Sequence, residues 1–155
     1  MTVILSVLFS VILVVALAVQ VYEDIKEGYL FDEVSLALAV VGLGRAIWLG
    51  NFLDACCGFL LGAVLLGILY YCTEGGMGLG DVFLAAAVGF WLGLWPSVVM
   101  ILVAFILGGA VAVVLLLWGK GRKTAIPFAP FIAVGTLVAY YYGREIIGWY
   151  FRMFI

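Results

Sequence analysis

Long apolar runs, separated by short charged or glycine-rich breaks, are the feature that most limits what this chain can fold into. The run Val3–Val21 holds only three polar residues, and Val82–Trp118 carries no charge. A helix needs about 20 mostly apolar residues to cross a bilayer core, and about six such helices fit a chain in which 68% of the 155 residues are apolar. We therefore predict an all-α membrane protein, a six-transmembrane-helix bundle that forms one membrane-embedded domain over residues 1–155.

Breaks in the apolar pattern predict where these helices begin and end. Charged residues must stay in or near water, because a charge at the bilayer centre costs several kcal/mol. A proline disfavours helical geometry in the residue before it and tryptophan suits the membrane interface, so Trp95-Pro96 should divide the longest run. The predicted spans are Val3–Val21, Val34–Gly50, Phe52–Cys72, the two parts of Val82–Trp118 and Ala125–Tyr142, with the tail from Gly143 at an interface.

Counting these crossings brings three breaks to one face of the membrane: Tyr22–Glu33, Thr73–Asp81 and Gly119–Phe128. Asp24 and Asp81 should then lie at similar depth on that face. It would carry four of the seven Lys and Arg residues, so the positive-inside rule favours a cytoplasmic location for it.

Several kinds of chemistry are excluded by the residues that the chain lacks. It has no histidine, which removes Ser-His hydrolysis and the HExxH metal site. Cys56, Cys57 and Cys72 form no CxxC pair and are interpreted as small apolar residues, so we expect no metal and no cofactor. Acids and bases are spread among short loops, which argues against nucleic acid as a partner.

Two carboxylates remain as a way to cut a peptide bond. When held close together they cannot both ionise easily, and the pair can activate water while one acid donates a proton to the scissile carbonyl. The glycines just before Asp81 would permit positive φ angles and close approach of an extended substrate. A flexible loop in which Asp81 merely caps the next helix explains the same residues, and the residues alone leave both interpretations open.

Two segments resemble a known family. Thr73–Gly93, TEGGMGLGDVFLAAAVGFWLG, resembles the GxGD region of the type IV prepilin peptidase family, and Ala125–Gly135, AIPFAPFIAVG, is similar to the proline-phenylalanine motif that follows it there. The resemblance covers nearly the whole chain and places Asp24 at the family's first catalytic aspartate. It implies a six-helix aspartic endopeptidase in which Asp24 and Asp81 are catalytic.

The resemblance also implies a substrate, a location and further site residues. The substrate would be a pilin, pseudopilin or archaellin precursor, cut at the cytoplasmic face of the cell inner (cytoplasmic) membrane. The partners would be this prepilin-like protein and the lipid bilayer, with a homodimer left open. The active-site loop or substrate contacts would include Gly78, Gly80, Glu74, Pro127 and Phe128.

Departures from the family pattern bear on substrate preference and on a second activity. Leu30-Phe31 stands where an Ile-Pro pair often follows the first aspartate, and Phe83 replaces a frequent lysine. Long bifunctional members add a cytoplasmic region with paired CxxC motifs and N-methylate the product. This chain has no such motifs, so we expect cleavage without methylation.

Two other functions fit parts of the sequence. Gly78-Leu79-Gly80-Asp81 also fits the signature of presenilin-like proteases, although Tyr22-Glu23-Asp24 and Ile126-Pro127-Phe128 depart from that family's other motifs. A small transporter or assembly protein could instead use the two aspartates to bind a cation or relay protons. Their expected place at the membrane edge, rather than its midplane, argues against transport. The remaining acids near Asp24, which are Glu23, Glu27, Asp32 and Glu33, are interpreted as a solvated acidic rim.

Overall fold

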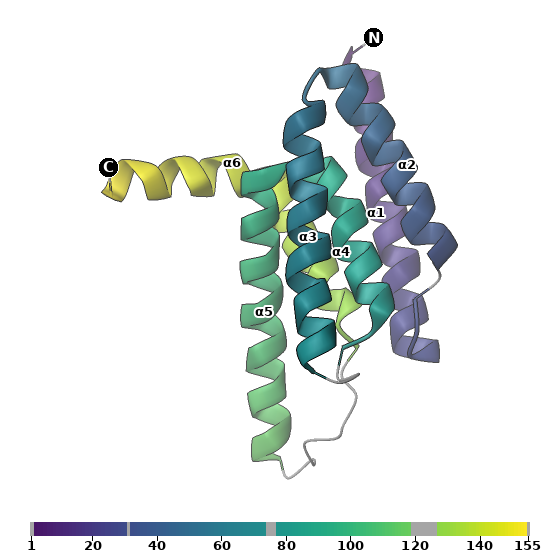
Figure 1. Cartoon of the computed structure of the whole chain (residues 1–155), viewed down its shortest axis with the longest axis vertical. Helices are drawn as coiled ribbons and strands as arrows, with labels where there is room; N and C mark the ends of the chain where they lie inside the picture. The colour runs from purple at the N-terminus through teal and green to yellow at the C-terminus, as the bar shows by residue number, and fades with distance from the viewer. Residues whose placement is uncertain (1, 31, 74–76, 119–126, 155) are drawn as a thin grey trace.

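The computed structural model describes residues 2–30, 32–73, 77–118 and 127–154. These residues form six helices and no strand, as predicted for an all-α protein (Figure 1). The helices are α1 (Thr2–Glu27), α2 (Asp32–Leu49), α3 (Phe52–Cys72), α4 (Leu79–Leu92), α5 (Leu94–Leu117) and α6 (Ala129–Phe154).

Three of the helices, α1, α3 and α5, are long and apolar enough to cross a bilayer. Their outer faces carry large apolar side chains, such as Leu53, which is 78% exposed. Exposure of so many large apolar side chains to water would be energetically unfavourable, whereas their exposure to lipid is not. The chain is therefore a membrane protein. The 14-residue α4 is apolar but shorter than the usual span of about 20 residues.

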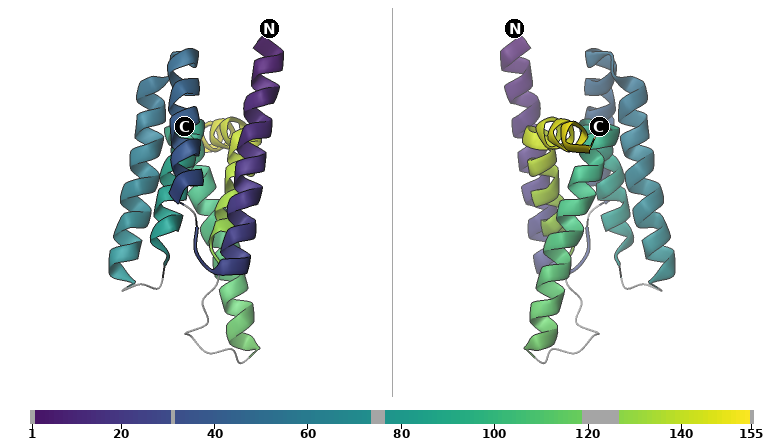
Figure 2. Two further views of the ribbon diagram at one scale, coloured as in Figure 1. Left: turned by 90° about the vertical axis from the view of Figure 1, so that its right-hand side faces the viewer. Right: turned by 90° about the vertical axis from the view of Figure 1, so that its left-hand side faces the viewer.

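Helix α4 lies inside the bundle, in contact with α2, α3, α5 and α6 (Figure 2). Glycines let α3 approach it closely: a Cβ added to Gly58 would collide with the carbonyl oxygen of Gly89, and one added to Gly62 would lie 2.5 Å from that of Ala85. Small residues at such contacts allow backbones to pack directly in membrane proteins. This packing buries the middle of α4, where Leu84 is fully covered.

The first helix is longer than predicted. We expected Tyr22–Glu33 to be a loop, but α1 continues to Glu27, so Asp24 lies on a helix. Charged residues end the contact with lipid without ending the helix, since no helix breaker occurs before Gly28. Gly28 has a φ of +73°, and its N–H donates to the carbonyl oxygen of Asp24 at 3.1 Å, as at many helix C-termini.

The long apolar run is divided at Gly93 and not at Trp95-Pro96. Gly93 has a φ of +77°, a conformation that other residues rarely adopt. The next residue, Leu94, donates its N–H to Oδ1 of Asp54 on α3 at 3.0 Å. Pro96 falls in the first turn of α5, where its missing N–H costs nothing.

The last helix leaves the bundle part-way along its length. Its first part packs among the other helices, and its C-terminal part turns and projects sideways from the bundle (Figures 1 and 2). Gly143 packs on Pro96 of α5, with an added Cβ only 2.9 Å from the proline Cβ. Beyond it, exposed Trp149 and Tyr150 are residues typical of a membrane interface.

Candidate active site

Asp24 and Asp81 come from different helices that meet at one end of the bundle. Asp24 lies in the last turn of α1 and Asp81 in the first turn of α4, and both of these helix ends lie at the lower end in Figure 1. Asp24 is 7% exposed and Asp81 6% exposed, so both carboxyl groups are largely removed from solvent. The charge of Asp24 acts on Asp81, as expected of a close carboxylate pair.

The start of α6 supplies hydrogen bonds to Asp24. The backbone N–H of Ala129 donates to Oδ2 of Asp24 at 2.9 Å, and the backbone of Phe128 also contributes a hydrogen bond. The first N–H groups of a helix have no partner within the helix, and the helix dipole places positive charge there. The beginning of α6 is therefore built to stabilise a negative carboxylate.

The two carboxylate oxygens of Asp81 have different surroundings. Its Oδ2 accepts a hydrogen bond from the N–H of Gly78, the N-cap of α4, at 3.2 Å. Its Oδ1 is buried and accepts no hydrogen bond within the described residues. An oxygen of this kind can bind a water molecule or a substrate group.

Burial also changes the acidity of Asp81, which lies in the first turn of α4, outside the three helices that are long and apolar enough to cross a membrane. Removal from solvent is the larger cause, and the negative charge of Asp24 the smaller one, of a rise in the pKa of Asp81 to about 7. The hydrogen bond from Gly78 acts in the opposite direction and lowers this pKa. A carboxylic acid with this pKa holds its proton in mildly acidic solution, as a general acid must.

Two of the four glycines before Asp81, Gly78 and Gly80, act differently from the prediction, and the other two, Gly75 and Gly76, lie outside the described residues. Gly78 has a φ of −72°, and the positive φ angles of the described residues occur at Gly28, Gly50 and Gly93, so the expectation of positive φ is wrong for Gly78 and Gly80. Gly80 instead makes room for a side chain of the same protein, because an added Cβ would lie 2.7 Å from Cβ of Leu30.

Leu30 belongs to the connection between α1 and α2 and is buried. Its contact with Gly80 therefore packs the chain that follows Asp24 against the first turn of α4. This contact connects the segments that carry the two aspartates.

Three further residues were predicted to belong to the active-site loop or to contact the substrate: Pro127, Phe128 and Glu74. Pro127 and Phe128 directly precede α6, and Phe128 packs against Phe105 and Phe131, with ring centroids 5.4 and 5.9 Å away. This packing holds the start of α6 beside Asp24. Glu74 lies outside the described residues.

Gln20 lies near the site although the sequence did not predict it, and Glu23 is not where it was predicted to be. Gln20 is fully buried four residues before Asp24, and its Nε2 donates to Oγ of Ser35 on α2 at 2.6 Å. The sequence contains one indication of its role: Gln20 is a polar residue within an apolar run, one helical turn before Asp24 and so on the same helix face. Glu23 was expected in a solvated rim but is 9% exposed, because α1 continues past it and turns it inward.

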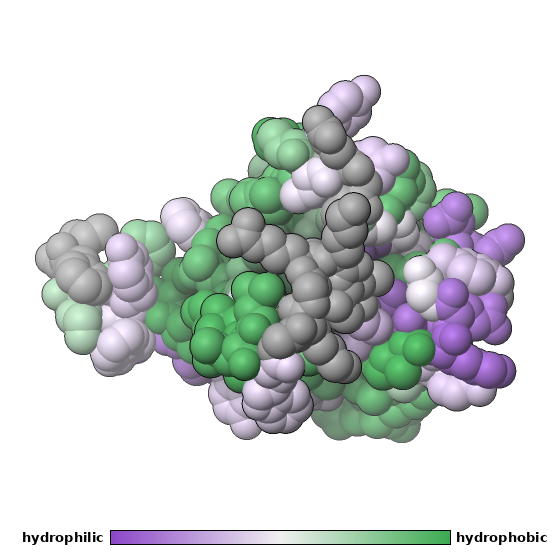
Figure 3. All heavy atoms as spheres, turned by 90° about the horizontal axis from the view of Figure 1, so that it is seen from below, coloured by the Kyte–Doolittle hydropathy of each residue, from purple (hydrophilic) through white to green (hydrophobic). Residues whose placement is uncertain are grey.

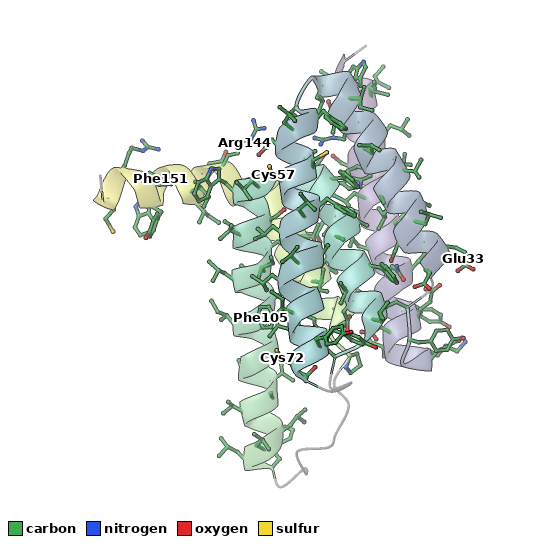
Figure 4. The ribbon with its side chains drawn as sticks, viewed as in Figure 1. Glu33, Cys57, Cys72, Phe105, Arg144 and Phe151 are labelled. Atoms are coloured by element: carbon green, nitrogen blue, oxygen red, sulfur yellow. The ribbon has the colours of Figure 1, made fainter. Side chains whose placement is uncertain are left out.

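The rest of the acidic rim is exposed as predicted. It comprises Glu27, Asp32 and Glu33, and Glu33 points outward from the start of α2 (Figure 4). Seen from this end, strongly hydrophilic residues gather where α1 ends and α2 begins (Figure 3). The two buried aspartates thus lie near an open, hydrophilic edge of the molecule.

The chemistry of this site is that of carboxylates. Among the described residues, no group of three His, Cys, Asp or Glu side chains could hold a metal ion. One carboxylate stabilised by backbone N–H groups, beside another that holds a proton near neutral pH, can activate a water molecule and donate a proton in the same step.

Comparison with known proteins relates the chain to one family. The model of the type IV leader peptidase family matches residues 11–113. A prepilin leader peptidase/N-methyltransferase of Legionella pneumophila is 32% identical over 154 residues, which cover 94% of this chain and 54% of that protein. The Bacillus subtilis protein of the same name is 36% identical over 107 residues, covering 68% and 42%. The chain thus spans about half the length of these relatives. No solved structure matches it.

Proposed function

Because the chain belongs to the type IV leader peptidase family, we propose that it is a membrane aspartyl endopeptidase that removes leader peptides from type IV prepilin-like precursors. Asp24 and Asp81 are the catalytic residues of this proposal. The observation that carries it is the meeting of two buried, interacting carboxyl groups at one end of the helix bundle.

The proposed mechanism gives each aspartate one task. Asp24, facing the N–H groups at the start of α6, is the ionised base that takes a proton from water. Asp81 is the acid that donates its proton to the oxygen of the scissile carbonyl as the water attacks the carbonyl carbon. The C–N bond of the tetrahedral intermediate then breaks as Asp24 passes its proton to the amine nitrogen. A hydroxyl group of the intermediate returns a proton to Asp81, so the new carboxyl group and amine leave with both aspartates restored.

The proposed substrate follows from the names of the relatives, and the proposed location from the distribution of Lys and Arg in the sequence. A protein named prepilin leader peptidase acts on prepilins, so the substrate here is a prepilin-like protein. Its leader junction would be cut at the cytoplasmic face of the inner membrane, with the C-terminal end of α1 and the N-terminal end of α4 on that side. Four of the seven Lys and Arg residues of the sequence fall in segments predicted on that side, and the positive-inside rule favours a cytoplasmic location for the side with more of them.

We also propose cleavage without N-methylation by this chain. The relatives are named for both activities, and the given sequence has no CxxC motif of the kind carried by the long bifunctional members of the family. Incubation of the purified 155-residue protein with a prepilin and S-adenosylmethionine should give a cleaved product with an unmodified N-terminus. Mass spectrometry of that product checks the proposal, and a methylated N-terminus would refute it.

The test of the function is cleavage of full-length prepilin-like precursors by purified protein in lipid nanodiscs. The wild type should cut at the leader junction, and Asp24→Asn should lower kcat/KM by about 100-fold or more. Asp32→Asn is the matched control, because Asp32 is an exposed carboxylate on the same face of the bundle.

Other outcomes would contradict the proposal in different ways. Cuts within the substrate's membrane helix would favour the presenilin-like function. No cleavage of any precursor by the folded wild type would exclude the peptidase and favour transport. Full activity in Asp24→Asn would exclude Asp24 as a catalytic residue and refute the aspartyl mechanism.

A further inference from the structure

A polar cavity lies at the opposite end of the bundle from Asp24 and Asp81. Its volume is about 510 Å³, and it is formed where α2 and α4 end, α5 begins and α6 leaves the bundle. Two arginines, Arg45 and Arg144, line it, and Arg144 lies where α6 turns away (Figure 4). The proposed peptidase mechanism uses no residue of this cavity.

Arg45 is held in place by aromatic rings. Its guanidinium lies 5.8 Å from the ring centroid of Trp91 and 5.5 Å from that of Tyr140, and its Nη1 donates to the carbonyl oxygen of Trp91 at 3.1 Å. Trp91 is itself fixed, because it is buried and its Nε1 donates to the carbonyl oxygen of Leu38 at 2.9 Å. A guanidinium held this way loses little freedom on binding an anion.

Most of the donors of Arg45 remain available for a ligand. A guanidinium has five N–H groups, and the hydrogen bond to Trp91 is the one Arg45 makes within the described residues. Neither Arg45 nor Arg144 forms an ion pair in that part of the chain. Two arginines facing one cavity without acidic partners are suited to a phosphate group, which arginine binds through paired N–H groups.

The cavity also presents acceptors to its ligand. Glu145 lines it beside Arg144, and Asn51 contributes an Oδ1 that is buried and accepts no hydrogen bond within the described residues. A phosphate alone would leave these acceptors unmatched, and Glu145 would repel it. A ligand with a hydrogen-bond donor close to its phosphate satisfies both sets of groups.

We propose that this cavity binds a phosphodiester lipid headgroup that carries an ammonium group, as in phosphatidylethanolamine. The phosphate lies between Arg45 and Arg144, and the ammonium faces Glu145 and Asn51. The source is a membrane lipid because the cavity adjoins the part of α6 that projects sideways from the bundle. This part carries the exposed Trp149 and Tyr150, residues typical of the membrane level at which headgroups lie.

Native mass spectrometry of the full chain in detergent tests this proposal. The protein is mixed with equal amounts of phosphatidylethanolamine and phosphatidylcholine, which have the same net charge but differ in ammonium N–H groups. Phosphatidylethanolamine should be retained preferentially, and Arg45→Gln should weaken its binding about tenfold or more, since a charge-assisted hydrogen bond is lost. Arg152→Gln is the control, because Arg152 lies on the outer part of α6 and does not line the cavity.

A specificity variant separates this effect from misfolding. Glu145→Gln should keep phospholipid binding but lose the preference for phosphatidylethanolamine over phosphatidylcholine. Inorganic phosphate, added as a competitor, should not displace the lipid. Displacement by phosphate at equal concentration would make this a site for free phosphate and refute the lipid assignment. Equal binding by wild type and Arg45→Gln, or no preference in the wild type, would overturn the proposal.

Discussion

At the scale of single residues, Asp81 combines a hydrogen bond from Gly78 on one carboxylate oxygen with a buried second oxygen that has no partner in the described part of the chain. Burial and the charge of Asp24 raise its pKa to about 7, so its proton is bound below that pH and lost above it. In the proposed mechanism the proton on Asp81 is required. The acid form is thus the active form.

This assignment predicts how peptidase activity depends on pH. The value of kcat/KM should fall as the pH rises through about 7, because Asp81 then loses the proton that it must donate. Initial rates on a prepilin-like substrate, measured in buffers of constant ionic strength, check this. Activity that continues to rise above this range would show that Asp81 is not the acid.

The contact between Gly80 and Leu30 predicts a second effect at this scale. Gly80→Ala should lower kcat/KM by about 10- to 100-fold, because the new Cβ displaces Leu30 and moves the first turn of α4 relative to α1. The double variant Gly80→Ala/Leu30→Gly should recover much of this loss, because glycine removes the Cβ of Leu30 that the new methyl group would meet. Gly44→Ala is the control, since nothing lies within 4 Å of its added Cβ. A double variant no more active than Gly80→Ala would contradict this explanation.

At the scale of the helices, the break between α4 and α5 depends on a cap from a third helix. Asp54 of α3 accepts the N–H of Leu94 and satisfies one of the free donors at the start of α5. Asp54→Ala should lower the free energy of unfolding by about 1 kcal/mol. Unfolding in mixed detergent micelles measures this loss, and Asp32→Ala, which removes an exposed carboxylate with no such hydrogen bond, is the control. Equal stability of the two variants would exclude the cap.

The same scale shows which parts of the fold can be predicted. The third span, Phe52–Cys72, was predicted at the residues where α3 begins and ends, because sharp changes in polarity coincide with its ends. The predicted end of α1 was wrong. Charged residues mark where contact with lipid ends, whereas the helix itself continues until Gly28. The break at Gly93 was also missed, because it depends on the contact with Asp54, which is far away in the sequence.

The candidate site was only partly predictable for a similar reason. Two aspartates on one face follow from counting membrane crossings and from the motif around Asp81. The N–H of Ala129 beside Asp24, the side chain of Leu30 against Gly80 and the hydrogen bond from Gln20 to Ser35 are tertiary contacts. Apolar pattern and local motifs contain no information about which backbone groups meet a given side chain.

At the scale of the whole molecule, the two ends of the bundle have different chemistry. One end has buried carboxyl groups near an acidic edge, and the other has a cavity with two arginines. The end of α1 and the starts of α4 and α6 must meet for the first of these to form, because α1 carries Asp24, α6 donates a hydrogen bond to it and α4 provides Asp81. The central claim is that these two aspartates act as one catalytic unit.

The most direct test of that claim compares kcat/KM of the wild type, Asp24→Asn, Asp81→Asn and the double variant on one precursor, with folding checked by circular dichroism and gel filtration. Each single change should lower kcat/KM by about 100-fold or more, and the double change should lower it no further than the more severe single change, because residues that act as a unit are not additive. Losses that multiply in the double variant, or a single variant with nearly wild-type activity, would contradict the account.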